Sequence, residues 1–294
     1  MLAIVIPYFK INFFESTLCS LANQTNKKFK VYIGDDNSPD DPKFLIAKHK
    51  NSIDFKYKKF QSNLGKSSLV SHWNRCIAMI DDEEWVMILG DDDVLSENVV
   101  EMFYNYLDAI DTKINVVRFA SCKIDAEGKE TSTIFLNPII ELSTDFLFRA
   151  SRSSLSEYVF NTNQIVKIGF KKFPLAWFSD KLAVLEFSGF KEVYSINDAV
   201  VYVRISDQSI SGIQNNYKEK LNATFDFYYY LLSIKKNFFS KLQQKELLEQ
   251  LVKVYLNDKK SIVKLLKVSK IFLSAMFFLD YLKFVKTIFF KNLK

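Results

Sequence analysis

Continuous apolar runs alternate with amphipathic stretches over the first hundred residues. Runs at residues 2–7, 29–33 and 85–89 have the length and uniform hydrophobicity of strands buried on both faces. Between them, residues 12–24 and 67–80 place apolar side chains at helical spacing. Strands that alternate with helices predict an α/β fold with a mostly parallel central sheet flanked by helices.

The same pattern continues, less regularly, to about residue 205. A short stretch at residues 53–57 predicts one more strand, and Ser96 is expected as the N-cap of a helix. Residues 115–205 mix strands, at 116–123 and 193–204, with helices.

Beyond residue 217 the pattern becomes helical. Residues 218–234, 241–256 and 261–291 contain neither Gly nor Pro, so each is expected to form one helix. We therefore expect an α/β domain over residues 1–212 and a helical C-terminal region over residues 213–294.

Composition and charge exclude two classes of protein. With 48% hydrophobic and 25% charged residues, the chain has a globular rather than a disordered composition. The segment from Asp258 to Lys294 accounts for the whole net charge of +6, because its nine lysines and two aspartates give +7. A nucleic-acid-binding protein would carry its basic stripe on the folded domain, so no nucleic-acid partner is expected. The basic, apolar tail predicts either contact with a membrane surface or helices packed on their own domain or a second subunit.

Cysteine spacing and hydropathy bear on location. Cys19, Cys76 and Cys122 lie far apart, which predicts neither a disulfide framework nor a zinc site and fits a reducing cytosol. The first residues lack a basic region and predict a strand rather than a signal peptide. The apolar stretch at 271–279 is nine residues long, too short to cross a bilayer. We expect a cytoplasmic protein, or one that is peripheral on the cytoplasmic face of the inner membrane.

Three adjacent carboxylates follow the predicted strand at residues 85–89. Asp91, Asp92 and Asp93 repel one another unless a cation or hydrogen-bond donors share the site. Mn²⁺ or Mg²⁺ takes oxygen ligands from one or two carboxylates, with phosphate and water supplying the rest. The alternative is a solvated acidic turn. In open α/β sheets, ligands bind beyond the carboxyl ends of strands, which favours the ligand site.

Two further acidic positions are candidates. Asp36 follows the strand at residues 29–33, where a carboxylate can accept a hydrogen bond from a nucleobase or ribose; an Asx-turn is the alternative. Asp180 follows an aromatic patch and precedes a helical pattern. Such a carboxylate can act as general base on a sugar hydroxyl, or it can simply favour the N-terminus of a helix. His49 and His72 do not form a metal-ligand pair by spacing.

Together, these segments resemble family 2 glycosyltransferases of the GT-A fold, a Rossmann-like α/β fold. The resemblance is specific over residues 1–110 and looser to about residue 212. It rests on the order and spacing of Ile4-Val5-Ile6-Pro7-Tyr8, Thr17–Thr25 (TLCSLANQT), Val31-Tyr32-Ile33-Gly34-Asp35-Asp36-Asn37-Ser38, Asn63-Leu64-Gly65, Trp73-Asn74-Arg75-Cys76, Leu89-Gly90-Asp91-Asp92-Asp93-Val94-Leu95, Asp180 and Val203-Arg204-Ile205-Ser206-Asp207-Gln208-Ser209-Ile210-Ser211.

The resemblance implies roles for these residues. Asp180 would be the base that deprotonates the acceptor hydroxyl in a single displacement with inversion. Asp92, supported by Asp93, would bind Mn²⁺ or Mg²⁺. The remaining residues would bind the nucleotide-sugar: Pro7, Tyr8, Asp36, Asn63, Asn74, Asp91 and Arg204. The acceptor would be a hydroxyl of a glycan or lipid-linked acceptor, in the biosynthesis of a bacterial surface polysaccharide.

Two departures from the family pattern keep alternatives open. Gly90 stands where the family's Asp-x-Asp-Asp pattern has its first aspartate, and Ser206 stands where many members have a histidine. These departures motivate a second hypothesis, a non-catalytic relative that binds nucleotide-sugars or serves as a scaffold. A nucleotidyltransferase would need a Gly-rich, basic triphosphate loop near the N-terminus, which residues 7–14 do not provide.

Overall fold

The computed structural model divides the chain into two compact units. One, here called the sheet unit, comprises Met1–Lys172 and Ser179–Asn215, and the other, the helical unit, comprises Phe173–Phe178 and Asn216–Lys294. The predicted boundary between residues 212 and 213 lies outside the described residues. The structure describes residues 1–108, 113–149, 152–207, 215–258, 261–274 and 277–290.

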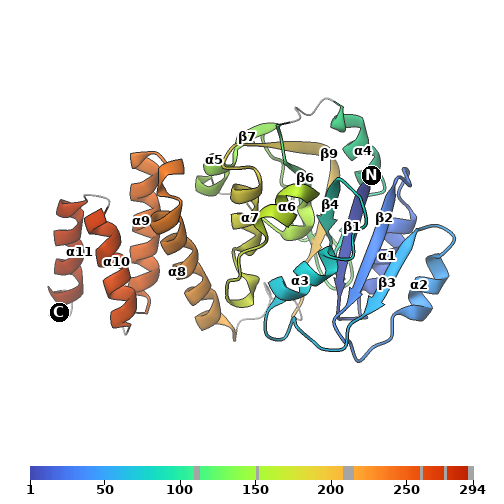
Figure 1. The fold of residues 1–294 in the computed structure, drawn as a ribbon, viewed down its shortest axis with the longest axis horizontal. Helices are drawn as coiled ribbons and strands as arrows, with labels where there is room; N and C mark the ends of the chain where they lie inside the picture. The colour runs from blue at the N-terminus through green and yellow to red at the C-terminus, as the bar shows by residue number, and fades with distance from the viewer. Residues whose placement is uncertain (109–112, 150–151, 208–214, 259–260, 275–276, 291–294) are drawn as a thin grey trace. The chain divides into compact units, whose positions relative to one another are not determined.

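The sheet unit begins with four parallel strands in the order β3-β2-β1-β4 (Figure 1). They are β1 (Leu2–Tyr8), β2 (Phe29–Asp35), β3 (Phe55–Lys59) and β4 (Trp85–Ile88). The apolar runs form β1, β2 and β4 because helices cover both faces of this part of the sheet. The predicted α/β fold is therefore confirmed.

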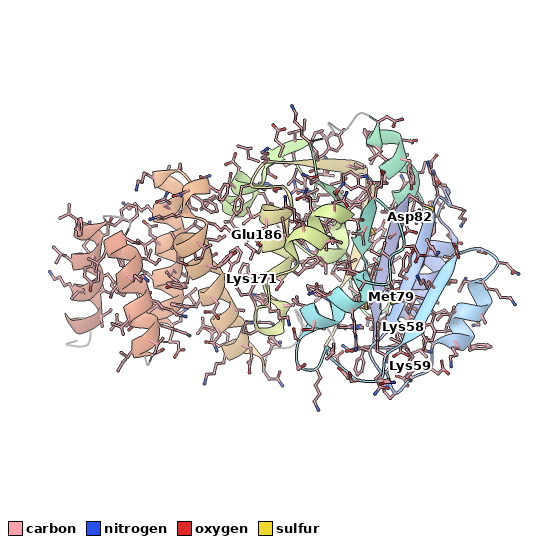
Figure 2. All side chains as sticks on the ribbon, viewed as in Figure 1. Lys58, Lys59, Met79, Asp82, Lys171 and Glu186 are labelled. Carbon is pink, nitrogen blue, oxygen red and sulfur yellow. The ribbon has the colours of Figure 1, made fainter. Side chains whose placement is uncertain are left out.

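Strand β3 lies at the edge of the sheet and carries lysines, including Lys58 and Lys59 (Figure 2). Charged side chains on an edge strand oppose pairing with another chain. Lys59 also donates to the Ser38 carbonyl at 2.9 Å, which fixes the loop that follows β2.

Beyond β4 the sheet is mixed. Strand β8 (Tyr158–Asn161) lies between β4 and β6 (Val116–Ile124) and is antiparallel to both. The long strand β9 (Glu192–Arg204) is parallel to β6, and it pairs in the antiparallel sense with β5 (Val94–Leu95) and β7 (Ile140–Leu142). The mostly parallel arrangement predicted from the sequence thus describes β1–β4, while the later strands run in both directions.

Helices connect the strands of the sheet unit. The predicted helices at residues 12–24 and 67–80 correspond to the shorter helices α1 (Phe14–Ala22) and α3 (Leu69–Ile77), because their ends continue as turns. The expected N-cap at Ser96 is wrong. Asn98 precedes α4, and the Ser96 hydroxyl instead donates to Asn98 Oδ1 at 2.8 Å and accepts from the Val200 amide at 3.0 Å. The helices are α1 (Phe14–Ala22), α2 (Lys43–His49), α3 (Leu69–Ile77), α4 (Val99–Leu107), α5 (Ser143–Phe148), α6 (Thr162–Ile168) and α7 (Ser179–Phe187).

The helical unit contains α8 (Tyr217–Ile234), α9 (Lys241–Leu256), α10 (Ile262–Ser274) and α11 (Phe278–Phe290). The single helix expected over residues 261–291 is wrong, since α10 and α11 are separate helices. Their separation lets the Phe272 ring pack 5.2 Å from that of Phe284, so both become buried. Among the residues that the structure describes, every helix falls short of the length and hydrophobicity that a membrane crossing requires.

Candidate functional site

The carboxyl ends of β1, β2 and β4 meet at one edge of the sheet, where the strand order reverses around β1. Hydrogen bonds tie these ends together. Asp91 Oδ2, after β4, accepts from the amides of Phe9 at 2.7 Å and Lys10 at 2.8 Å, after β1. The Asp36 amide, after β2, donates to the Tyr8 carbonyl at 2.9 Å. Ligands of open α/β sheets bind at such a switch point.

Asp92 is the half-buried central residue of the acidic turn. Its carboxylate accepts no hydrogen bond from any other residue that the structure describes. Burial raises the pKa of this carboxyl, while the nearby charges of Lys10 and Arg204 oppose the shift. A half-buried carboxylate to which no other described residue donates is suited to a cation.

Asp93 differs sharply from its neighbour. It is 5% exposed, and both of its oxygens accept hydrogen bonds: Oδ1 from the Arg204 amide at 2.9 Å, and Oδ2 from the Ser156 hydroxyl. Burial, with the adjacent charge of Asp92, raises the pKa of Asp93 to about 7. Asp91 shows a smaller shift from the same two causes, to a pKa of about 6. These contacts give Asp93 a structural function in the turn.

The glycine at position 90 has a steric explanation. A Cβ atom at Gly90 would lie 2.9 Å from Asp92 Oδ1 and 3.0 Å from Asp93 Oδ2. An aspartate here would therefore press a third carboxylate against two others. The glycine instead leaves space into which Asp92 Oδ1 and Asp93 Oδ2 both point.

The acidic turn fits a divalent ion in part. Among the described residues, no group of three or more His, Cys, Asp and Glu side chains is gathered so as to hold a metal by itself. Asp92 alone offers an uncommitted carboxylate, and Asp91 has one oxygen engaged by backbone amides. Such a donor set suits Mg²⁺ or Mn²⁺, which commonly take one or two carboxylates and complete their shell with phosphate and water.

Arg204, at the end of β9, braces the acidic turn. Its Nε donates to the Asp92 carbonyl at 2.9 Å, and its Nη1 donates to the Asp125 carbonyl at 2.6 Å. The guanidinium also lies 4.5 Å from the centre of the Phe13 ring. Arg204 is 4% exposed, so in this structure it contacts the turn rather than open solvent.

Asp36 organises the loop that contains Asn63. Its carboxylate is 2% exposed and accepts from the amides of Leu64 and Gly65, both at 2.8 Å, and from the Arg75 guanidinium. Asn63 Oδ1 accepts from the amide three residues further on, which closes a turn. The structure thus brings Asp36 and Asn63 together.

The remaining nucleotide candidates have different surroundings. Tyr8 is fully buried; its ring packs 4.7 Å from that of Phe14, and its hydroxyl donates to the Asp40 carbonyl at 3.1 Å. Pro7 is half-buried opposite Gly34 in the sheet. Asn74 is exposed on α3, and no hydrogen bond joins its side chain to another predicted site residue within the described ranges. Their roles in binding stay predictions.

Asp180 lies in the first turn of α7 and is half-buried. Its Oδ2 accepts from the Ser153 hydroxyl at 2.9 Å, and Ser153 Oγ lies 2.9 Å from the Tyr158 hydroxyl. Nearby, Arg152 pairs with the buried Glu157 at 2.7 Å. Sequence reasoning missed these contacts, because serines between apolar runs indicate only a loop.

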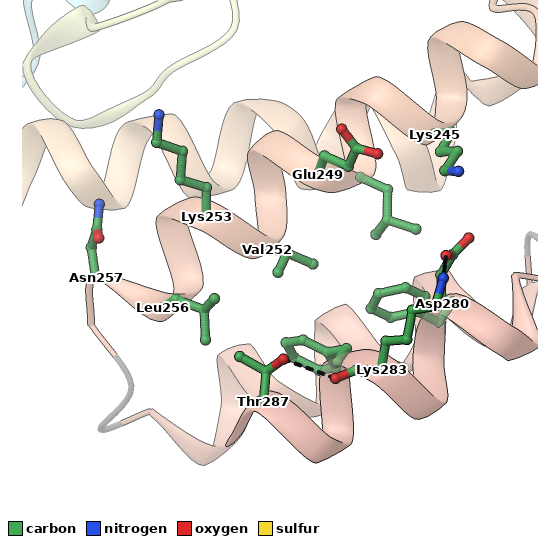
Figure 3. Close-up of a pocket in the computed structure, with 12 residues that line it drawn as sticks. Lys245, Glu249, Val252, Lys253, Leu256, Asn257, Asp280, Lys283 and Thr287 are labelled. Atoms are coloured by element: carbon green, nitrogen blue, oxygen red, sulfur yellow. Dashed lines mark hydrogen bonds and ion pairs between the residues drawn. The ribbon is translucent and has the colours of Figure 1, made fainter. Parts of the chain in front are cut away.

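The helical unit has a cavity of its own, with a volume of about 450 Å³ (Figure 3). Apolar side chains from α9 to α11 line it, including Val252 and Leu256, and the lysines Lys245, Lys253 and Lys283 stand around it. None of the predicted site residues contributes to its lining.

Comparisons with known proteins agree with this geometry. The chain is similar to three crystal structures of S. aureus TarS, each at 14% identity. For TarS 1–349 in complex with UDP-GlcNAc, the TM-score is 0.64, and the match covers 93% of this chain and 80% of that one. For TarS 1–349 in complex with UDP, the TM-score is 0.61, with 86% and 70% covered. For TarS the TM-score is 0.64, with 93% and 49% covered.

At this identity the likeness establishes the fold, which is of the GT-A type. No curated protein matches the chain. The family model described as Glycosyl transferase family 2 matches residues 3–172, more than half of the chain. This match includes the acidic turn and the loops after β1 and β2. The chain therefore belongs to glycosyl transferase family 2 and is a glycosyltransferase.

Proposed function

We propose that this glycosyltransferase moves an N-acetylhexosamine, or a related hexose, from a UDP-linked donor to a hydroxyl of a glycan or lipid-linked acceptor, with inversion. The TarS complexes with UDP and UDP-GlcNAc support the donor class. Membership of the family favours this enzyme over a non-catalytic relative. We assign the catalytic domain to residues 1–212.

One observation carries the proposal. An uncommitted carboxylate, Asp92, stands at the switch point of the sheet, while a second carboxylate, Asp180, is held by the segment that also contacts Asp93. A lone base is sufficient for inversion, because retention would ask for a second carboxylate acting as nucleophile. Both groups therefore have the chemistry that the reaction requires.

In the proposed reaction, Asp180 accepts the proton of the acceptor hydroxyl. The acceptor oxygen forms a bond to the anomeric carbon of the donor sugar from the face opposite the diphosphate. The bond from the anomeric carbon to the diphosphate oxygen breaks, and the departing UDP keeps the electron pair. Asp91 and Arg204 maintain the shape of the acidic turn and of the loop after β1, where the donor is proposed to bind, through their contacts with backbone groups.

We assign Asp92 as the main ligand of a Mn²⁺ or Mg²⁺ ion, with Asp93 as a supporting group. A divalent ion there supplies positive charge to the leaving diphosphate. Asp92 suits this role because no other described residue donates a hydrogen bond to its carboxylate. The donor-binding residues Pro7, Tyr8, Asp36, Asn63 and Asn74 belong to the same proposal.

We further propose that the helical unit contacts the cytoplasmic face of the inner membrane, where a lipid-linked precursor of a surface polysaccharide would be found. Several apolar side chains on α10 and α11 are more than half exposed, among them Leu266 at 65% and Leu279 at 76%. Exposed lysines, such as Lys270 and Lys283, accompany them. Apolar and basic groups on one pair of helices suit an anionic membrane surface.

The substitution Asp180→Asn tests the proposal. We expect wild-type protein with Mn²⁺ to release UDP from UDP-GlcNAc, and the variant to release it roughly a thousandfold more slowly, because the base is lost. UDP affinity, measured by calorimetry, should stay within about twofold. Full activity in Asp180→Asn would refute the base assignment, and UDP binding without turnover by wild type would favour the non-catalytic relative.

A further inference from the structure

Residues 152–158, here called the serine segment, lead into β8. Because β8 is antiparallel to β4, with Val159 opposite Met87, the residues before β8 lie beyond the carboxyl end of β4. The acidic turn begins at that end. Topology alone therefore brings the serine segment against the acidic turn.

Ser156 makes the first contact. It is 3% exposed, and its Oγ accepts from the Gly90 amide at 3.0 Å. Its hydroxyl proton is donated to Asp93 Oδ2. Ser156 therefore joins the start of the acidic turn to its last carboxylate, and it satisfies a half-buried donor and a buried acceptor at once.

Ser153 makes the second contact, with Asp180. A serine hydroxyl has one proton, and at 2.9 Å it is donated to Asp180 Oδ2. The Tyr158 hydroxyl, also 2.9 Å from Ser153 Oγ, must then be the donor of that bond. Burial raises the pKa of Tyr158, which keeps this proton in place. The two bonds point the same way and strengthen each other.

The hydrogen bonds from Tyr158 to Ser153 and from Ser153 to Asp180 fix the orientation of the Asp180 carboxylate. Oδ2 is held by Ser153, and no described residue donates to Oδ1. A fixed first oxygen leaves the second as the proton acceptor. The segment is itself anchored by Arg152, whose Nη1 donates to Glu157 at 2.7 Å and to Ser121 at 3.2 Å.

We infer that Ser153 and Ser156 are positioning residues that couple the two halves of the active site. Ser156 shapes the acidic turn that receives the donor, and Ser153 aims the base. This inference rests on the proposed role of Asp180. It assigns different kinetic consequences to two serines that are three residues apart.

The inference is tested by kinetics of UDP-GlcNAc turnover with Mn²⁺. We expect Ser153→Ala to lower kcat about tenfold while donor KM is unchanged, since a hydrogen bond to a carboxylate is lost. Ser153→Thr, which keeps the hydroxyl, should restore most of kcat. Ser156→Ala should instead raise donor KM about tenfold, because the Gly90 amide and Asp93 lose their partner.

Ser154 provides a matched control. Its hydroxyl makes no hydrogen bond within the described part of the chain, so Ser154→Ala should leave both constants unchanged. Thermal unfolding of each variant separates kinetic effects from loss of fold. If Ser156→Ala does not fold, Ser156→Cys, which nearly keeps the volume, takes its place.

Two results would overturn the inference. Wild-type kcat in Ser153→Ala, alongside an inactive Asp180→Asn, would leave the base assignment standing and remove the positioning role. If both serine variants showed the same fall in kcat and the same rise in donor KM, a common structural weakening would be indicated. Absence of turnover in wild type, in contrast, would contradict the proposed function itself.

Discussion

The sheet unit and the helical unit each depart from the usual pattern of burial, but with different kinds of side chain. The sheet unit buries charged side chains, including Asp36, Glu157 and Arg204, each less than 5% exposed. The helical unit exposes apolar ones, such as Ile262 at 73% and Leu282 at 66%. In most globular folds the buried groups are apolar and the exposed ones polar.

Burying charged groups and exposing apolar ones both cost free energy of folding, so each feature indicates a function. A buried charge is tolerated only with partners, and the partners of Asp36 and Glu157 fix loops and segments around the proposed site. A group of exposed apolar side chains indicates a surface that associates with something else. In the proposed function, the chemistry belongs to the sheet unit and membrane association to the helical unit.

After the thousandfold loss expected for Asp180→Asn, the next largest effect separates two adjacent aspartates. Asp92→Ala should lower UDP-GlcNAc turnover roughly a hundredfold and abolish its dependence on Mn²⁺, while the melting temperature measured without metal barely changes. Asp93→Ala should mainly lower stability, by about 2 kcal/mol, because the Arg204 amide and Ser156 lose a buried acceptor. Chemical unfolding and metal titration measure both. Full Mn²⁺-dependent activity in Asp92→Ala would refute its assignment as the ligand.

The next effect concerns pH and Glu157. Burial raises the pKa of Glu157 to about 7, from an ordinary value of 4.5. Between these values the unfolded chain releases a proton that the folded chain retains, so the free energy of unfolding falls as pH rises. This group should contribute a loss on the order of 3 kcal/mol between pH 4.5 and 7.5.

The variant Glu157→Gln isolates this contribution, since the amide resembles the protonated acid. Urea unfolding of both proteins should give similar stabilities at pH 5 and a more stable variant at pH 7.5. A variant that is weaker than wild type at pH 7.5 but not at pH 5 would mean that Glu157 is ionised beside Arg152 in the folded protein.

The smallest expected effect lies in the helical unit. The pair Leu266→Asp and Leu279→Asp should weaken binding to anionic lipid vesicles at least tenfold, since exposed apolar groups are replaced by charges. Turnover of soluble UDP-GlcNAc should not change. Vesicle sedimentation measures the binding, with Leu242→Asp on α9, where Leu242 is 77% exposed, as the matched control. An equal loss in the control would contradict a specific membrane-binding surface.

The burial of each strand or helix also determines how much of it could be predicted from the sequence. Strands β1, β2 and β4 were predictable because a strand buried on both faces is a continuous apolar run. Since parallel strands end at one edge, the approach of both Asp36 and Asp91 to the end of β1 followed from strand order alone.

Other features depend on contacts between distant residues. The antiparallel placement of β8 beside β4 leaves no local signal, so the contacts of Ser153 and Ser156 could not be foreseen. Helix α2 was missed because its seven residues are too few to show a helical period, and none of them is buried. The separation of α10 from α11 is set by the packing of Phe272 on Phe284, which helical periodicity alone does not reveal.

The most direct test of the proposed single displacement with inversion is the stereochemistry of donor cleavage. UDP-GlcNAc carries its sugar in the α configuration, and in the absence of an acceptor water can take the place of the hydroxyl. Time-resolved proton NMR of wild-type protein with UDP-GlcNAc and Mn²⁺ should show β-N-acetylglucosamine forming first, together with UDP, before the anomers equilibrate. Initial release of the α anomer would contradict a single displacement with Asp180 as the lone base.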